Sequence, residues 1–487
     1  MLLNEFLENS AQKYPDKEAL VCQGIRYTYA QLNSAANSLA HVFISKGLKK
    51  QDRVAIYLEN SSESVVSIFA ALKAGGIFVV INPQVKAKKL EYILNDCQAK
   101  ILVTNSNDLG ETDVTVVPSR TVQFAGEEPN LPKSCIDIDL ASLIYTSGST
   151  GNPKGVMLTH LNMVSAANSI TEYLDNTPDD IILDCLPLSF DYGLYQVLMA
   201  FKFGGRVVLE RSFTYPYQII DLIIKEKVTG FPIVPTISAI LLQLKNLNKY
   251  DFSKLRYITN TAQALPPKHI FGLRDLFPHV KIFSMYGLTE CKRVAYLKPE
   301  LVEKKPTSVG KAMPNMEVYL VDENGDMITQ PNTIGELVIR GAHIMKGYWN
   351  LFEETAKRLK PGLYGNEQVL YSGDYFKMDE DGDLYFISRK DDIIKTAGEM
   401  VSPKEVENVL YDIDDVVEAA VIGVPDEILG NAVKAFVALS EGSQFTERDI
   451  LLHCQKNLEN FKIPKFIEFR KELPKTTTGK IRKKELV

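Results

Sequence analysis

The sequence predicts an α/β protein with a large, subdivided N-terminal domain and a small C-terminal α+β domain. Its 487 residues are too many for one hydrophobic core, because single cores stop growing at about 250–300 residues. Helix and strand patterns alternate over most of the chain, which is typical of repeated α/β winding. From about Gly310 the alternation gives way to short strands with turn signals, which indicates a β-rich subdomain.

The alternating elements begin at the N-terminus. Residues 1–20 carry Glu5 and Glu8 inside an apolar periodicity and lack the basic start and apolar core of a signal peptide, so they predict an amphipathic helix. Gly204 and Gly205 are expected to close a later helix. The periodicities predict helices over 29–46, 61–74 and 192–203 and strands over 52–58, 77–82, 181–186 and 206–209.

Two compact patterns follow. Short strands at 317–321 and 335–340, with the turn signal DENG between them, predict a β-rich subdomain over about 310–388. The last unit is expected to contain a helix at 403–411 and strands at 416–424 and 433–438. The charged stretch 389–392 separates the two patterns. We therefore expect an N-terminal domain over 1–389 and a C-terminal domain over 390–487.

Composition limits what the protein can do. The formal net charge of −6 argues against broad binding to nucleic acid or to anionic membranes. The most apolar stretch, 65–83, is interrupted by Lys73 and by two glycines, so it predicts a buried helix, a turn and a strand and no membrane span. The six cysteines form no CxxC pair, which fits reduced thiols and indicates neither a zinc nor a redox site. We expect a cytoplasmic enzyme.

One loop combines hydroxyls, glycines and a lysine. It runs from Tyr145 to Gly155 with the sequence YTSGSTGNPKG and follows a short apolar strand. Amides and hydroxyls in such a loop can surround phosphate oxygens. The spacing is that of neither a Walker A loop nor the GxGxxG dinucleotide fingerprint. Taken alone, the loop also fits a flexible Gly/Ser linker.

Five further motifs follow this loop along the chain. They are YGLTE at 286–290, GELVIRG at 335–341, YSGD at 371–374, SRKDDIIK at 388–395 and PKTTTGK at 474–480. In this order the six motifs resemble the signature of the adenylate-forming superfamily, which holds acyl-CoA synthetases, adenylation domains of nonribosomal peptide synthetases and firefly luciferase. The motifs cover nearly the whole chain. The resemblance implies a stand-alone, AMP-forming ligase that couples a carboxylic acid to AMP and then passes the acyl group to a pantetheine thiol.

The resemblance implies ATP and Mg²⁺ as cofactors. The acid's carboxylate and the α-phosphate of ATP are both anions, so the reaction requires positioning and cationic stabilisation. Thr289 would hold phosphates and Glu290 would ligate Mg²⁺. Lys480 would bridge the carboxylate and the α-phosphate, although a lysine so near the C-terminus also fits a solvated tail. The implied phosphate-binding residues of the loop are Thr146, Ser147, Gly148, Ser149, Thr150, Gly151 and Lys154.

The nucleoside would lie against the later motifs. Tyr286 is expected beside the adenine, and Asp374, assisted by Arg389, would accept hydrogen bonds from both ribose hydroxyls. Asp374 also fits a plain turn aspartate after Ser372–Gly373. The sequence departs from the family in two places: Ser388 stands where glycine is usual, and TNTAQAL at 259–265 replaces a glycine-rich segment beside the adenine.

The acid-binding residues have the weakest signature. Asp191 matches the aspartate that pairs with the amino group in amino-acid-activating members, but it also opens a helix, where Asp is a preferred N-cap. Arg293 fits either a partner for a second acidic group on the substrate or a structural salt bridge. We expect a small, polar or medium-sized acid in preference to a long fatty chain. The remaining pocket residues given by the resemblance are Tyr192, Tyr195, Asn260 and Met285.

Other functions on the same fold stay open. A non-catalytic adenylate sensor would be expected to lack Glu290, Asp374 or Lys480, and all three are present. A luciferase-like oxidase would share the adenylation step and then consume O₂. Within the ligases, the acceptor thiol belongs either to coenzyme A or to a carrier protein. Because no carrier domain follows the lysine motif before Val487, any carrier protein is expected to act in trans.

The resemblance further implies a mobile C-terminal domain. One rigid domain cannot present both of its ends to the same pocket at once. Asp391 matches the family's hinge, about which the domain would offer Lys480 for adenylation and then the loop of Gly398 to line the entrance for the thiol. Asp391 also fits a solvated linker residue whose replacement matters little.

Two substitutions separate the half-reactions. Lys480→Ala should nearly eliminate adenylate formation from ATP and acid, yet leave thioester formation from a supplied acyl-adenylate largely intact. Asp391→Pro should do the reverse, because proline fixes φ at about −65° and restricts the rotation. Each half-reaction is measured separately for both variants. Equal impairment of both steps by Lys480→Ala, or impairment of neither by Asp391→Pro, would contradict the alternating-domain hypothesis.

Overall fold

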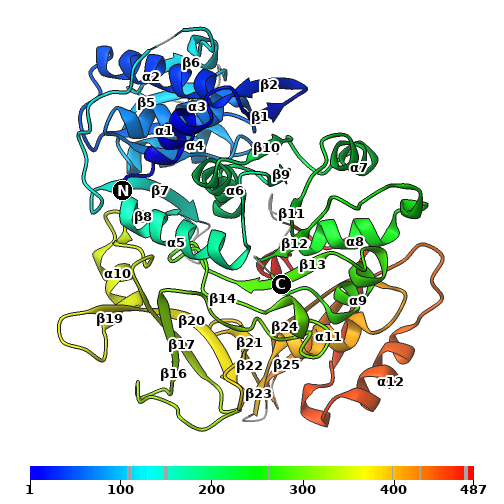
Figure 1. Cartoon of the computed structure of the whole chain (residues 1–487). Coiled ribbons are helices and arrows are strands. Elements are labelled where there is room, and N and C mark those ends of the chain that lie inside the picture. Colours follow the sequence, from blue (N-terminus) through cyan, green and yellow to red (C-terminus); the bar gives the residue numbers. More distant parts are fainter. Residues whose placement is uncertain are drawn as a thin grey trace.

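A computed structural model describes residues 1–106, 109, 112–126, 128–146, 152–261, 263–396, 399–426, 429–475 and 481–486. Within these ranges the strands form four sheets of nine, seven, five and five strands, with helices between and around them (Figure 1). The first two sheets hold the N-terminal α/β part, the third is the β-rich unit, and the fourth belongs to the C-terminal unit. The predicted α/β class is confirmed.

The nine-stranded sheet has the order β15-β14-β13-β12-β11-β9-β10-β1-β2. Its central strands, from β13 to β1, run parallel, and the antiparallel strands lie at its two edges. Its strands are β1 (Glu18–Cys22), β2 (Ile25–Thr28), β9 (Ile181–Asp184), β10 (Arg206–Leu209), β11 (Gly230–Ile233), β12 (Tyr257–Asn260), β13 (Lys281–Tyr286), β14 (Ala295–Tyr296) and β15 (Lys311–Ala312).

The seven-stranded sheet has the order β18-β8-β7-β4-β3-β5-β6. Strands β7 to β6 of this order run parallel, and β8 and β18 continue the sheet antiparallel. Its strands are β3 (Arg53–Tyr57), β4 (Ile77–Val80), β5 (Ala99–Thr104), β6 (Thr115–Pro118), β7 (Leu140–Thr146), β8 (Lys154–Thr159) and β18 (Gly347–Tyr348).

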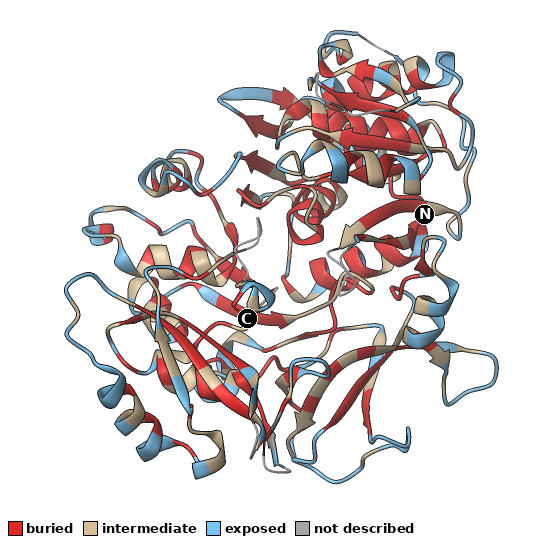
Figure 2. Ribbon diagram, turned by 180° about the vertical axis from the view of Figure 1, so that it is seen from behind, coloured by how far each residue is buried: buried red, intermediate tan, exposed pale blue. Residues whose placement is uncertain are grey.

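Helices between the two large sheets form the main core. α3 (Ser62–Lys73) contacts strands of the seven-stranded sheet, α6 (Asp191–Phe203) contacts strands of the nine-stranded sheet, and both are buried nearly all round. Figure 2 shows most of these strands and large parts of the helices between them in red. The other helices of this part are α1 (Glu5–Lys13), α2 (Tyr29–Ser45), α4 (Ala87–Asp96), α5 (His160–Tyr173), α7 (Pro216–Lys225), α8 (Pro235–Gln243) and α9 (Pro267–Leu276).

The two smaller sheets follow in sequence. In the β-rich unit, β20 pairs with β17, β19 and β21. The helix α10 (Phe352–Arg358) contacts both this unit and β18. In the C-terminal unit, β25 pairs with β22, β24 and β26, and α11 (Pro403–Tyr411) and α12 (Glu447–Asn457) cover the sheet. The strands are β16 (Met316–Val321), β17 (Gly335–Gly341), β19 (Leu359–Pro361), β20 (Gln368–Met378), β21 (Leu384–Arg389), β22 (Ile394–Thr396), β23 (Glu399–Val401), β24 (Val416–Asp426), β25 (Gly430–Leu439) and β26 (Phe466–Phe469).

The elements agree closely with those predicted. Each predicted helix and strand is present with ends that shift by a few residues, and α11 has the predicted bounds. The side chain of Thr28 caps α2 through a reciprocal capping box with Gln31, and Gly204 ends α6 with φ +77°, as expected for a glycine cap. No helix in the described part of the chain is both long and apolar enough to cross a membrane. All six cysteines are unpaired thiols.

Candidate active site

The predicted phosphate loop lies between two antiparallel strands. β7 ends at Thr146 and β8 begins at Lys154, and these two residues are partners in the sheet register. Ser147, Gly148, Ser149, Thr150 and Gly151 fall outside the described residues. Because a strand follows the loop, the chain does not have the strand–loop–helix arrangement of a Walker A motif, in agreement with the sequence spacing.

Lys154 is engaged by a neighbouring helix. Its Nζ lies 2.5 Å from a carboxylate oxygen of Glu354 on α10 and 5.4 Å from the centre of the Tyr348 ring. Hydrogen bonds from Lys154 and from Lys357 lower the pKa of Glu354 to about 2. A phosphate that binds Lys154 must therefore compete with Glu354. The sequence offered no signal for this pair, because its members are 200 residues apart.

Glu290 has one fixed and one open carboxylate oxygen. The hydroxyl of Tyr348 donates to Oε1 at 2.7 Å, and the main-chain N–H of Met345 donates to the carbonyl of Glu290. The other carboxylate oxygen has no hydrogen-bond or ion-pair partner in the described part of the chain. A hard oxygen ligand with a fixed orientation fits Mg²⁺. Thr289 precedes it and is half-buried.

Asp374 brings two of the predicted nucleoside residues together. Its Oδ2 accepts a hydrogen bond of 2.5 Å from the hydroxyl of Tyr286, at the end of β13. Its Oδ1 lies 3.8 Å from Nε of Arg389, its partner in the register of β20 and β21. The Asp374 side chain is buried, whereas the Arg389 side chain is half-exposed. Ser388 continues β21 into Arg389 without a turn, so the departure from glycine is accommodated in a strand.

Burial gives Asp374 an unusual acidity. Removal of its carboxylate from water raises its pKa to about 6, against the opposing effects of the Tyr286 hydroxyl, Arg389 and Arg358. At neutral pH the group is ionised and retains unused lone pairs, since a carboxylate can accept several hydrogen bonds. That arrangement suits the recognition of two neighbouring hydroxyls.

Arg358 is a site residue that the sequence analysis missed. It ends α10, and its Nη1 donates to the main-chain carbonyls of Tyr371 and Ser372. Burial lowers its pKa, but electrostatic interactions with Tyr348, Glu290 and Asp374 outweigh this effect, and its pKa is raised above the ordinary value. Gly373, with φ +71°, lets the guanidinium approach, because a Cβ there would lie 2.0 Å from Nη1.

Asp191 pairs with a lysine of the protein and is not the N-cap of α6. The N-cap of α6 is Phe190, and no side chain caps that helix, so the N-cap interpretation is wrong. The Nζ of Lys292 donates to the main-chain carbonyl of Asp191 at 2.7 Å and lies 3.4 Å from its carboxylate. Both side chains are buried, and burial lowers the pKa of Lys292 to about 7. The carboxylate of Asp191 thus already has a partner from the protein itself, the amino group of Lys292.

The remaining predicted pocket residues are buried side by side. The ring of Tyr195 lies 4.4 Å from Nζ of Lys292, and the ring of Tyr192 lies 5.3 Å from the guanidinium of Arg293. Tyr192 donates to the carbonyl of Thr259, beside Asn260. The sulfur of Met285 accepts from the Tyr173 hydroxyl. Arg293 has no carboxylate partner among the described residues, so the predicted structural salt bridge is absent from the described part of the structure.

The predicted hinge lies in an exposed turn. Asp391 stands between β21 and β22, and the neighbouring Lys390 pairs with Glu336 at 2.9 Å. Asp414, after α11, pairs with Lys268 on α9, so the C-terminal unit contacts the nine-stranded-sheet part directly. Lys480 and Gly398 fall outside the described residues.

A cluster of three aspartates near the end of β20 has a structural role. Among the described residues, the carboxylates close enough to share a metal ion are those of Asp379, Asp381 and Asp383. The Nζ of Lys305 lies within 2.6–2.8 Å of all three. The ammonium group already supplies the positive charge that these carboxylates require.

Comparisons with known proteins identify the family. The "AMP-binding enzyme" family model matches residues 7–349, and the "AMP-binding enzyme C-terminal domain" model matches residues 405–480. The chain belongs to the AMP-binding enzyme family. A long-chain-fatty-acid–CoA ligase of Bacillus subtilis is 33% identical over 100% of this chain and 94% of its own length.

Solved structures of similar proteins agree with the fold of this AMP-binding enzyme. ATP-bound MatB from Rhodopseudomonas palustris superposes with a TM-score of 0.90 at 28% identity, covering 100% of this chain and 98% of that one. O-succinylbenzoate coenzyme A synthetase from Bacillus subtilis, in complex with ATP and magnesium ion, gives 0.87 at 27% identity over 98% of each chain. The predicted family and the predicted class, an ATP-dependent, AMP-forming acid–thiol ligase, are confirmed.

The acidity of Asp374 predicts a pH dependence of nucleoside binding. Ribose hydroxyls bind the ionised carboxylate best, and the carboxylate takes up a proton as the pH falls through about 6. The dissociation constant should therefore rise below pH 6, by up to about tenfold per pH unit. Adenosine is the preferred probe, because it has no phosphate that titrates in this range. Asp374→Asn should bind weakly at every pH without the inflection, and an inflection that persists in this variant would contradict the assignment.

Proposed function

We propose that this ligase activates a carboxylic acid with ATP and transfers the acyl group from the adenylate to the thiol of coenzyme A. The observation that carries the proposal is the buried carboxylate of Asp374, which faces Tyr286 and Arg389 in a chain that matches AMP-binding enzymes over most of its length. Relatives named as CoA ligases support coenzyme A as the acceptor. A separate carrier protein with a phosphopantetheine group offers the same thiol and is the alternative acceptor.

The first half-reaction joins two anions. A carboxylate oxygen of the acid attacks the α-phosphorus of ATP, and the bond to pyrophosphate breaks. Asp374 and Tyr286 hold the nucleoside, while Thr289 and the loop between Thr146 and Lys154 face the phosphates. Lys480 bridges the two anions and offsets their repulsion, which is the largest electrostatic barrier to this step.

Glu290 is the proposed ligand for Mg²⁺. Tyr348 holds one oxygen of the Glu290 carboxylate, and the other has no partner in the described part of the chain. The structure of the similar O-succinylbenzoate coenzyme A synthetase, solved with ATP and magnesium ion, supports a magnesium site in this protein. When bound, Mg²⁺ neutralises phosphate charge and orients the departing pyrophosphate.

The second half-reaction forms the thioester. The sulfur of coenzyme A attacks the acyl carbon, the bond between that carbon and the AMP oxygen breaks, and the thiol proton leaves to solvent. Rotation about Asp391 exchanges Lys480 for the loop of Gly398 between the two steps. The exposed turn that contains Asp391 supports this hinge, because few contacts need to break there.

The acid lies against α6 and the ends of β12 and β13. Tyr192, Tyr195, Asn260 and Met285 are buried there, which favours a small or medium-sized acid. The pairing of Asp191 with Lys292 favours an acid without an amino group. The proposal includes a cytoplasmic location. The six cysteines support it, because all are unpaired and all but the half-buried Cys135 are buried.

The reaction products test the proposal. Incubation with ATP, Mg²⁺, a carboxylic acid and coenzyme A should release AMP and pyrophosphate in equal amounts and yield an acyl-CoA, because cleavage occurs at the α-phosphate. Omission of coenzyme A should leave pyrophosphate formation limited to about one turnover, with the adenylate retained. Release of ADP, or consumption of O₂ in proportion to AMP, would contradict the proposal. A carrier protein that replaces coenzyme A as the better acceptor would correct only the acceptor.

A further inference from the structure

Arg293 is a buried cation without a counter-ion in the described part of the structure. Its side chain is only 1% exposed, and among the described residues it is the largest of the fully buried side chains. Its Nε and Nη1 have no hydrogen-bond partner among the described residues. No carboxylate of the described residues forms a salt bridge with it. Buried charged groups are normally paired, so this guanidinium requires an explanation.

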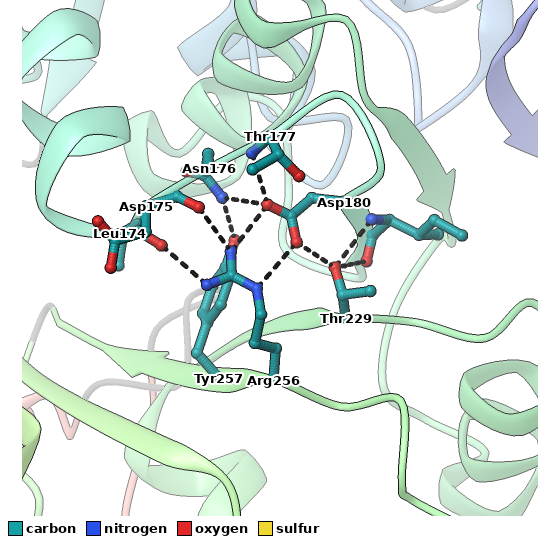
Figure 3. A network of polar contacts seen from close by, with 9 residues as sticks. Leu174, Asp175, Asn176, Thr177, Asp180, Thr229, Arg256 and Tyr257 are labelled. Carbon is teal, nitrogen blue, oxygen red and sulfur yellow. Dashed lines mark hydrogen bonds and ion pairs between the residues drawn. The ribbon is translucent and has the colours of Figure 1, made fainter.

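Arg256 shows how the same protein partners a structural arginine. Its guanidinium lies 4.9 Å from the centre of the Tyr257 ring, much as Arg293 lies 5.3 Å from that of Tyr192. Arg256 also donates to the Asp180 carboxylate at 2.8 and 3.1 Å and to the carbonyls of Leu174 and Asp175 at 3.2 Å each (Figure 3). It is fully partnered although its side chain is 33% exposed. Arg293 is more deeply buried, and within the described residues it has the Tyr192 ring and the Tyr173 side chain as partners but no carboxylate.

Neighbouring carboxylates do not neutralise Arg293. Asp191 pairs with Lys292, which directly precedes Arg293 in the chain. Asp184 is fully buried, and burial raises its pKa well above the usual range, which favours its neutral form. The Asp191 carboxylate is thus engaged by Lys292, and Arg293 is left without a carboxylate partner in the described part of the structure.

The aromatic contact does not offset this charge. A desolvated cation–π interaction contributes less than the effective cost of burying an ion. An anion that enters with the ligand would supply the difference. Arginine suits this task because its planar fork of N–H groups matches a carboxylate at two points and stays charged.

Arg293 lies beside the residues proposed to hold the acid. Its guanidinium faces the ring of Tyr192, from α6. Burial raises the pKa of Tyr173 to about 12, and the nearby charge of Arg293 acts in the opposite direction. The Tyr173 hydroxyl in turn donates to the sulfur of Met285 at 3.1 Å. Arg293 therefore shares its surroundings with two of the proposed acid-pocket residues.

We propose that Arg293 binds a second anionic group on the acid, so that the preferred substrate is a dicarboxylic acid. The inference rests on the proposed function. One carboxylate reacts with ATP, and the other stays unchanged against the guanidinium of Arg293. Arg293 is thus a specificity-determining residue for the acid.

Wild-type enzyme tests the inference without any substitution. Pyrophosphate release is measured for a homologous series of linear dicarboxylic acids and for the monomethyl ester of each, which keeps the length and removes one charge. For the best-fitting length, kcat/KM should be at least about 30-fold higher for the diacid, because a buried guanidinium left unpaired costs 2 kcal/mol or more. Comparable values for diacids and esters would overturn the inference and leave the proposed function standing.

Variants assign the preference to the side chain. Arg293→Met should lower kcat/KM for the diacid to about that of its monoester, whereas Arg293→Lys should retain part of the preference. Arg256→Met is the matched control: it removes a partnered arginine, should lower the thermal unfolding midpoint, and should keep the preference for the diacid. The thermal unfolding midpoint of Arg293→Met should be no lower than that of the wild type, since the substitution removes a buried charge that has no carboxylate partner among the described residues.

The possible failures are distinguishable. Equal losses for diacid and monoester in Arg293→Met would overturn the inference, because Arg293 would then act on the reacting carboxylate. A wild-type preference that survives in Arg293→Met would also overturn it. Absence of pyrophosphate release with every acid, including monocarboxylic and aromatic acids, would instead overturn the proposed function.

Discussion

The hydrogen bond between Tyr286 and Asp374 is the interaction on which the site depends. It joins the end of β13, in the nine-stranded sheet, to β20 in the β-rich unit. The Tyr286 ring packs against Phe376 and Phe386, so the apolar contact and the hydrogen bond fix the same junction. This packing keeps water from Asp374 and raises its pKa to about 6. A carboxylate in such surroundings binds hydroxyl groups more strongly than one in water would.

Most of the fold could be predicted from the sequence, because local patterns encode its elements. The period of 3.6 residues and the threonine before Tyr29 define α2, and Gly204 ends α6 where a left-handed residue is needed. The pairing of Asp374 with Arg389 joins two separate motifs that were assigned together to the ribose, and the register of β20 and β21 places them opposite each other. The order of strands in the sheets has no local signature.

The contacts that tune the site could not be predicted, because their members are far apart in sequence. Asp191 meets Lys292 across 101 residues, whereas local reasoning offered an N-cap role as one of two alternatives. Lys154 meets Glu354 across 200 residues. That Arg293 has no carboxylate partner among the described residues is likewise visible only in three dimensions, because residue spacing does not show which charges pair.

A double-mutant cycle on AMP binding tests most directly whether Tyr286 and Asp374 form the ribose site. The affinity for AMP is measured by titration calorimetry for the wild type, Tyr286→Phe, Asp374→Asn and the double variant. Loss of a hydrogen bond to a charged group should cost Asp374→Asn about 1.5–3 kcal/mol. Tyr286→Phe should weaken binding in the wild-type background and have little further effect beside Asp374→Asn, with a coupling energy of about 0.5–3 kcal/mol. Wild-type affinity in Asp374→Asn, or strictly additive effects, would contradict the account.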